Sequence, residues 1–443
     1  MSSVKSSRLP ALICLALFAA QMASAKPGQL DSSFGNGGIV VTTFAQDVRP
    51  LDAVLQPNDD VLVVGGLNDF VVATEVAVVA RYLPNGMLDS SFGVGGVAKD
   101  ELNNFLNEAD AVALQGDGKI VILEHAVGSS NPDGSVNPDI YALVRFNHTG
   151  HLDGTFGKGG RVVINIPHPA FFTSVANTLL LQPDQKLLVG GGVFPPYRST
   201  VSPQTVLARY LPSGAADHTF GNLGMVEQVA IGEPAALAVR ADGSILAANG
   251  SIGTAFGPPT AQFSSTGALV PHVTGGIVTA STHASSVSPI AFLSDGEFLE
   301  AVGAQGPFGR HDHDVQVLLV QPNGTVDNGF QSPAFDFGVI DSFTNIAQAI
   351  AVGPTGEIAV GGFEANIQTL SGDDFALTRL LSNGSLDAKF GNGGQVIAPL
   401  PTGGQVLAIL VQPDSKILAI GQAFLRNPST PLTGIALVRY LTQ

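Results

Sequence analysis

Short apolar runs separated by turn sequences recur along the chain from about residue 26 to its end. In one stretch these runs span residues 160–166, 176–182, 186–192 and 204–211. Runs of this length, bounded by Gly, Pro, Asn and Asp, are typical of β-strands rather than of helices. The linking sequence Gln182-Pro183-Asp184-Gln185 places proline and then aspartate where a tight hairpin turn favours them. Each unit is therefore predicted to hold four short antiparallel strands.

The unit repeats about every 60 residues. A turn glycine that precedes a Leu-Asp-like pair marks each copy, at Gly28, Gly86, Gly150, Gly214, Gly267, Gly324 and Gly384. Good copies of the segment behind it read LDSSFGNGGIVV from Leu30 and LDAKFGNGGQVI from Leu386, whereas the copy after Gly267 has lost both the aspartate and the phenylalanine. Repeated four-stranded units with tight hairpins are the signature of propeller blades. The chain is predicted to be an all-β, seven-bladed β-propeller of four-stranded antiparallel blades.

The repeat resembles the delta-60 repeats of bacterial secreted proteins. The similarity lies in the Leu-Asp-x-x-Phe-Gly segment and in a second segment, which reads LQPDQKLLVGGG from Leu181 and VQPDSKILAIGQ from Val411. It covers essentially all of residues 26–443 and implies a secreted propeller-like fold without implying an activity. The Gly-Gly strand is also similar to that of kelch propellers, although the tryptophan of that pattern is absent.

Two charged residues recur in register around the turn glycine. An arginine precedes an aspartate by eight residues in four units, namely Arg81 and Asp89, Arg145 and Asp153, Arg209 and Asp217, and Arg379 and Asp387. Across a tight turn this spacing brings opposite charges side by side on neighbouring strands. Asp31 and Arg439 are left without partners near the two ends of the repeat array. They become an equivalent pair if residues 37–44 form the outermost strand of the blade built from residues 405–441.

This pairing predicts that the N-terminal strand closes the ring by joining the C-terminal blade. In the alternative, each blade starts at the Gly-x-Val strand and no such closure is needed. The fixed geometry favours a structural role for the Arg–Asp pairs over ligand recognition. The same reasoning assigns the repeated phenylalanines to core packing: Phe34, Phe92, Phe156, Phe220, Phe330 and Phe390. Units in which the Arg–Asp pattern lapses, the fourth to the sixth, are expected to be less regular.

Residues 1–25 read as a signal peptide. Lys5 and Arg8 precede an apolar run that is too short for a membrane anchor, and Ala23-Ser24-Ala25 supplies the small residues of a cleavage site before Lys26. The protein is therefore expected to be exported to the periplasm or the extracellular space, with residues 26–443 as one propeller domain. No membrane span is expected after cleavage, and we expect a monomer. The lone cysteine, Cys14, lies inside the leader, so disulfides are not expected.

The chain is acidic, with 20 basic and 36 acidic residues and a net charge of −16. Removal of the leader makes this charge more negative. Such a surface repels nucleic acids and anionic membranes, and favours cations or basic partners.

The connections fall into two sets. The hairpins between strands one and two and between strands three and four are short and uniform, whereas the other connections vary and, by alternation, share the opposite face. Variable loops on a rigid frame are where binding sites are usually built. The candidate binding residues on that face are His311, Asp312, His313, Asp314, Glu364, Asp373 and Asp374. The imidazoles and carboxylates could hold a transition metal, and the carboxylates alone could hold calcium; a solvated polar loop is the alternative. No other cofactor is evident.

Recognisable catalytic motifs are absent: there is no Gly-x-Ser-x-Gly elbow, His-Glu-x-x-His or P-loop. The leading hypothesis is thus a non-enzymatic propeller that binds a protein or glycan through the variable face. The runner-up is a hydrolase or lyase of an extracellular polymer, whose acids converge at the ring centre from different blades. Glu108, Asp110, Glu364 and Asp373 are its candidate carboxylates.

Overall fold

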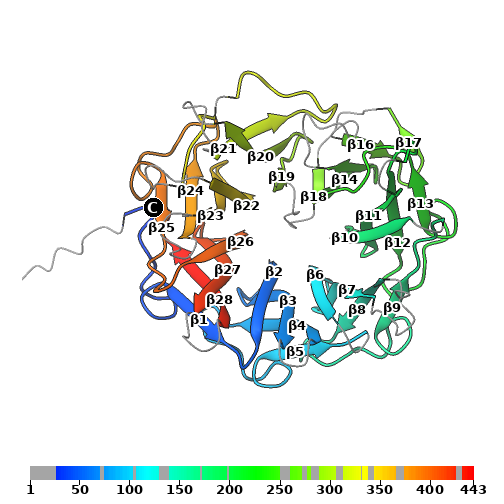
Figure 1. Ribbon diagram of the computed structural model, residues 1–443, viewed down its shortest axis with the longest axis horizontal. Coiled ribbons are helices and arrows are strands. Elements are labelled where there is room, and N and C mark those ends of the chain that lie inside the picture. The colour runs from blue at the N-terminus through cyan, green and yellow to red at the C-terminus, as the bar shows by residue number, and fades with distance from the viewer. Residues whose placement is uncertain are drawn as a thin grey trace, which may run out of the picture.

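The computed structural model shows β-sheets arranged radially as blades in a ring (Figure 1). It describes residues 26–69, 74–102, 106–128, 139–169, 172–196, 199–249, 260–271, 277–280, 289–305, 313–330, 332–337, 344–365, 374–425 and 432–443. The predicted leader, residues 1–25, lies outside this part. Within the described residues, no helix is long and apolar enough to cross a membrane.

The protein is a seven-bladed β-propeller, as predicted. In blades 1, 2, 3 and 6 the four strands follow one another in the chain from the innermost outward. Blade 1 contains β2 (Asp47–Leu55), β3 (Val61–Asp69), β4 (Thr74–Tyr82) and β5 (Val97–Asp100). Blade 2 contains β6 (Leu106–Leu114), β7 (Ile120–Val127), β8 (Ile140–Phe146) and β9 (Arg161–Ile164). Blade 3 contains β10 (Thr173–Leu181), β11 (Leu187–Phe194), β12 (Gln204–Tyr210) and β13 (Met225–Gln228).

The second half of the ring is less uniform. Blade 4 contains β14 (Ala236–Arg240), β15 (Ile245–Ala248), β16 (Thr260–Phe263) and β17 (Leu269–Val270), with β18 (Ile277–Ala280) added beside β14. Blade 5 contains β19 (Ile290–Phe292), β20 (Phe298–Gln305) and β21 (His313–Val320). Blade 6 contains β22 (Thr344–Val352), β23 (Ile358–Ala365), β24 (Asp374–Leu380) and β25 (Gln395–Ile397). Blade 7 contains β26 (Gly404–Val411), β27 (Ile417–Leu425), β28 (Leu432–Tyr440) and, outermost, β1 (Ile39–Thr43).

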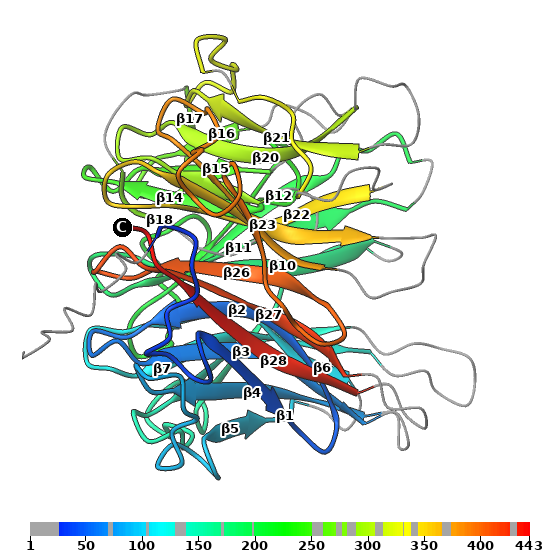
Figure 2. The same ribbon diagram turned by 90° about the vertical axis from the view of Figure 1, so that its left-hand side faces the viewer.

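The predicted ring closure is confirmed. β1 pairs antiparallel with β28, from Ile39 opposite Val438 to Thr43 opposite Gly434. The Asp31 amide also donates to the Arg439 carbonyl at 2.8 Å. The N-terminal strand therefore completes the C-terminal blade, and the alternative without such a closure is wrong. Figure 2 shows β1 beside β28 at the edge of the ring.

Blades 4 and 5 carry the expected irregularity. In blade 4, β18 lies against the inner edge of β14. In blade 5, a single bridge between Val315 and Phe335 takes the place of a regular outer strand, and a parallel contact of His313 with Thr344 links the blade to β22. Blade 6, which contains the intact pair of Arg379 and Asp387, keeps four paired strands.

Each repeated arginine joins one blade to the next. Arg209 of β12 donates through Nε to Asp217 at 2.7 Å and through Nη1 to the Ser265 carbonyl of blade 4 at 2.6 Å, and its guanidinium lies 4.4 Å from the centre of the buried Phe220 ring. Arg81, Arg145, Arg379 and Arg439 make the equivalent set of contacts with their own aspartates, phenylalanines and following turns. The Arg–Asp pairs thus lie in the seams between blades. Of the repeated phenylalanines, Phe330 is half-buried and the others are buried.

Candidate functional site

The innermost strands share a β-bulge near the variable face. In five blades the register with the second strand skips one residue, and the skipped residues are Leu51, Asp110, Asn177, Gln348 and Leu407. A bulge leaves its extra residue outside the ladder and redirects the neighbouring side chains. The fold therefore presents one unpaired position in each of these blades along the inner edge of the ring.

A glycine on the second strand usually accommodates this bulge. Gly65, Gly191, Gly362 and Gly421 lie opposite the residue before the skipped one. A Cβ atom at Gly65 would lie 1.9 Å from the Arg49 carbonyl oxygen, and the other three glycines show nearly the same clash. Close backbone approach thus explains one glycine of each Gly-Gly pair, and neighbouring side chains crowd the other.

Blade 2 departs from this rule, because Glu124 and His125 occupy the places of Gly65 and Gly66. Glu124 is fully buried. Burial, reinforced by the charge of the neighbouring Asp100, raises the pKa of Glu124 far above its ordinary value.

His125 stands in a cross-strand row formed by three strands of blade 2. It is paired in register with Glu108 of β6 on one side and with Tyr141 of β8 on the other. Directly opposite residues on one face of a sheet are close neighbours. The imidazole stacks on the Tyr141 ring with centroids 4.7 Å apart and planes 9° from parallel, and Tyr141 Oη donates to the Ser174 carbonyl at 3.1 Å. The orientation of the imidazole is therefore fixed by packing.

Asp110, the bulge residue of blade 2, completes a compact set of ligand atoms. One side-chain atom each of Glu108, Asp110 and His125 can be chosen so that all three lie within 4.8 Å of one another. His125 Nε2 is buried, lies 3.6 Å from an Asp139 carboxylate oxygen, and forms no hydrogen bond among the described residues.

Further acidic groups from neighbouring blades surround this set. Arg49 of β2 forms an ion pair with Glu108 at 3.3 Å, and its own side chain is 62% exposed. Glu75 of β4 lies over Gly66, because a Cβ atom at that glycine would be 2.1 Å from Glu75 Oε1. Glu233, which precedes β14, accepts a hydrogen bond from the bulge residue Asn177. We call the carboxyl groups of Glu75, Glu108, Asp110 and Glu233 the acidic rim.

The carboxyl groups of the acidic rim repel one another in a partly desolvated place. Burial, together with the charge of Glu108, raises the pKa of Glu75 to about 7, although Arg49 opposes the shift. Burial also raises the pKa of Asp110 well above its ordinary value, and Glu108, Glu75 and Glu233 add to it. Burial raises the pKa of Glu233 as well. Desolvated carboxylates of like charge disfavour ionisation, which makes this rim a candidate functional site.

The binding residues named from sequence lie elsewhere in the ring. His313 and Asp314 begin β21 of blade 5, and Glu364 and Asp374 are register partners on β23 and β24 of blade 6. These blades lie across the ring from blade 2 (Figure 1). His311, Asp312 and Asp373 lie outside the described residues.

Of the four carboxylates considered for catalysis, Glu108 and Asp110 are brought together. Glu364 is on β23 of blade 6. Sequence reasoning missed Arg49, Glu75, His125, Tyr141 and Glu233. A signal for His125 was present, since Glu124-His125 replaces the Gly-Gly pair of other copies. The remaining members come from other blades and depend on the closed ring.

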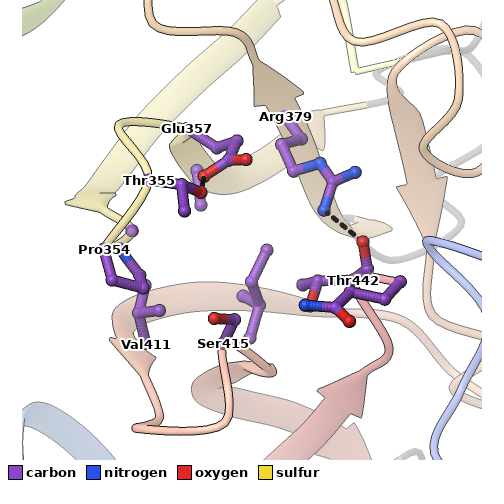
Figure 3. A pocket seen from close by; sticks show the side chains of 11 residues that line it. Pro354, Thr355, Glu357, Arg379, Val411, Ser415 and Thr442 are labelled. Atoms are coloured by element: carbon purple, nitrogen blue, oxygen red, sulfur yellow. Dashed lines mark hydrogen bonds between the residues drawn. The ribbon is translucent and has the colours of Figure 1, made fainter.

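A groove on the opposite face lies in the seam between blades 6 and 7 (Figure 3). Pro354 and Thr355 of one hairpin face Ser415 of the next, and Arg379 Nη1 donates to the Thr442 carbonyl at 3.3 Å. Another groove, lined by Arg209, follows the seam between blades 3 and 4. Because seam contacts already occupy both arginines, these grooves are features of blade packing.

The fold and the acidic rim together define a β-propeller with a group of acidic side chains on its variable face. Residues 56–92 and 353–390 match the family described as "Domain of unknown function (DUF5122) beta-propeller". Each matched segment runs from the first hairpin of a blade to its repeated phenylalanine, Phe92 or Phe390. This similarity supports a propeller repeat.

Similarity to other known proteins is remote. No curated protein matches the chain in sequence. Among solved structures, the β-propeller domain of the Trilobed protease from Pyrococcus furiosus is 10% identical, with a TM-score of 0.40 over 90% of this chain and 95% of that one. The polysaccharide lyase Uly1 is 11% identical, with a TM-score of 0.40 over 95% and 94% of the two chains. A glucose dehydrogenase is 10% identical, with a TM-score of 0.35 over 90% and 99%. Likeness at this level carries no activity over to the present chain.

Proposed function

We propose that the protein is an exported, non-enzymatic propeller that binds a protein or glycan ligand on its variable face, with the acidic rim at the centre of the binding surface. It acts as a monomer in the periplasm or outside the cell, as the leader pattern of residues 1–25 and the resemblance to delta-60 repeats suggest.

The observation that carries this proposal is the convergence of carboxyl groups from blades 1 and 2 and the start of blade 4. The negative charges of Glu108, Glu75 and Glu233 act on Asp110. Among the described residues, the cation that pairs with this group is the exposed Arg49. Bringing like charges together in a desolvated place costs free energy. A positive charge arriving with a ligand relieves that cost, and the net charge of −16 attracts such a charge from a distance.

The test is a binding screen of the purified protein against glycans and secreted proteins, repeated with a divalent cation and with chelator. Saturable binding without turnover is expected, with a loss of about tenfold or more when Glu108→Gln and Asp110→Asn are combined. The matched control is Asp184→Asn, which removes a carboxylate from an exposed hairpin on the opposite face. Equal binding by the rim variant and the control would show that the ligand is held elsewhere.

The second candidate is a hydrolase or lyase acting on an extracellular polymer. It is favoured by Glu75, because burial and the charge of the neighbouring Glu108 raise the pKa of Glu75 to about 7. A carboxyl group whose pKa is raised toward neutrality is suited to general acid–base catalysis. Product formation that Glu75→Gln abolishes would establish this candidate over the first.

A further inference from the structure

In the row of Glu108, His125 and Tyr141, the imidazole of His125 is held in place and has a nitrogen without a hydrogen bond among the described residues. Stacking on Tyr141 fixes the imidazole plane, and Nε2 is inaccessible to solvent without a hydrogen bond among the described residues. A buried polar atom without a hydrogen bond loses its interaction with water and gains nothing in return. The carboxylate of Asp139 lies at 3.6 Å from Nε2, beyond hydrogen-bonding distance.

Two carboxylates lie close to this imidazole. The bulge leaves Asp110 outside the ladder, and Glu108 is the direct register neighbour of His125. One oxygen of each carboxylate and one nitrogen of the imidazole are within 4.8 Å of one another. Ligand atoms bonded at about 2.0–2.2 Å to one metal ion are separated by roughly 3–4 Å, so a small rotation of Glu108, whose side chain is 20% exposed, closes the set.

From this geometry we infer that Glu108, Asp110 and His125 bind one divalent transition-metal ion, of the zinc or manganese class. One imidazole and two carboxylates suit such ions, whereas calcium takes oxygen ligands in larger number. Asp139 is near enough to His125 to supply a further oxygen.

The surrounding charges agree with a cation at this position. Glu75 and Glu233 add negative potential without being ligands. Arg49 is the group that competes with a metal, since it pairs with Glu108 at 3.3 Å. An exposed arginine can turn into solvent at small cost, because a surface ion pair is weak. The inference deepens the proposed function, since the bound ion would be the positive charge that the rim requires and could coordinate an oxygen of the ligand.

The experiment is isothermal titration of the purified, chelator-treated protein with Zn²⁺, Mn²⁺ and Ca²⁺, each alone. One equivalent of Zn²⁺ or Mn²⁺ should bind. Substitution of Co²⁺ should give an absorption spectrum that reports nitrogen coordination. His125→Gln should weaken binding at least tenfold, and His218→Gln, which removes an exposed histidine on the opposite face, should leave it unchanged. If His125→Gln does not fold, Glu108→Gln at the partly exposed ligand serves in its place.

Any of three results would overturn the metal site. The first is no stoichiometric binding of a transition metal, and the second is binding that is unchanged in both His125→Gln and Glu108→Gln. The third is Ca²⁺ binding of equal strength that His125→Gln does not weaken. The ligand screen in chelator separates this inference from the proposed function. If a ligand binds at the rim in the presence of chelator, the proposed binding function is supported whether or not the metal site exists. The metal site itself is tested by the titration.

Discussion

Replacing Arg439 by methionine perturbs the contact that closes the ring while keeping most of the side-chain volume. Arg439 donates to Asp31 Oδ2 at 2.9 Å, to Ser33 Oγ at 3.1 Å and to the Pro84 carbonyl at 2.8 Å, and it lies over the Phe34 ring at 4.4 Å. Its chemical environment is nearly that of Arg209, but its aspartate is 408 residues away in the chain instead of 8. Arg209→Met is thus a matched control for everything except connectivity.

The magnitude follows from burial. The side chains of Arg439 and Asp31 are each 8% exposed. Removing one partner of a buried ion pair costs about 3–5 kcal/mol. Asp31 keeps its hydrogen bonds with Ser33 and an ion pair with Lys416 at 3.2 Å, so we expect the lower end of that range. Asp217 keeps equivalent contacts, and both variants should lose about 3 kcal/mol of global stability.

The two variants should differ in where they open. Hydrogen exchange of the β1 amides, Ile39–Thr43, should accelerate selectively in Arg439→Met, because β1 is held to β28 by pairing and not by a short turn. In Arg209→Met the outer strand β13 stays tethered by its own turn, and exchange should rise only with global unfolding. Limited proteolysis should cut residues 26–46 first in Arg439→Met alone.

Acid provides an independent check of the same pair. Burial would raise the pKa of Asp31, but hydrogen bonds from Ser33 and Lys416 and the charge of Arg439 outweigh it and lower the pKa from 3.8 to about 2. The ionised pair therefore stabilises the fold fully above about pH 4, and this contribution, up to about 2 kcal/mol, is lost as the pH falls through 2. Two results together would refute the role assigned to the closure pair. The β1 amides would exchange equally fast in both variants, and Asp31→Asn would leave the acid dependence of stability unchanged.

Two further perturbations test the bulge and its exception in blade 2. Gly362→Ala should destabilise the protein by about 2 kcal/mol or more in a denaturant titration, because its Cβ would lie 1.9 Å from the Ile346 carbonyl oxygen. Gly303→Ala, which has open space around it, should be nearly neutral. Equal effects of the two substitutions would contradict the steric argument. Glu124→Gln should stabilise the protein on the order of 2 kcal/mol at pH 8 and little at pH 4, since a raised pKa means that stability declines as the carboxyl ionises with rising pH. Parallel stability curves for wild type and Glu124→Gln would show that Glu124 does not carry this pH dependence.

Several features could be predicted from the sequence because they repeat. The eight-residue spacing of Arg209 and Asp217 recurs with the same turn between its members, so local chain geometry was sufficient to pair them. Asp31 and Arg439 could be paired by exclusion, since they were the two members of the repeated Arg–Asp set that had no partner eight residues away. The Arg–Asp pattern lapses where Gln262 and Leu319 stand five residues before the turn glycine in place of arginine, and these lapses likewise marked the irregular blades 4 and 5.

The acidic rim could be predicted only in part, since Glu108 and Asp110 were among the candidate carboxylates but Glu75 and Glu233 were not. Its members are single departures from the repeat, and each looks like a solvated surface residue when taken alone. Asp110 becomes important because a bulge removes it from the ladder, and a bulge depends on the register of two strands rather than on one strand's own sequence. His125 could have been noticed as a substitution for a glycine, but its proximity to Asp110 could not.

Repetition along the chain thus determined the number of blades, their four-stranded design and the closure of the ring, because periodic hydrophobicity and turn chemistry act over a few residues at a time. The tertiary structure alone decided which charged groups outside the repeated Arg–Asp pairs meet. Closing the ring brings Arg49 and Glu75 of blade 1 to Glu108 of blade 2. Charges interact over distances in space, and only the folded ring sets those distances.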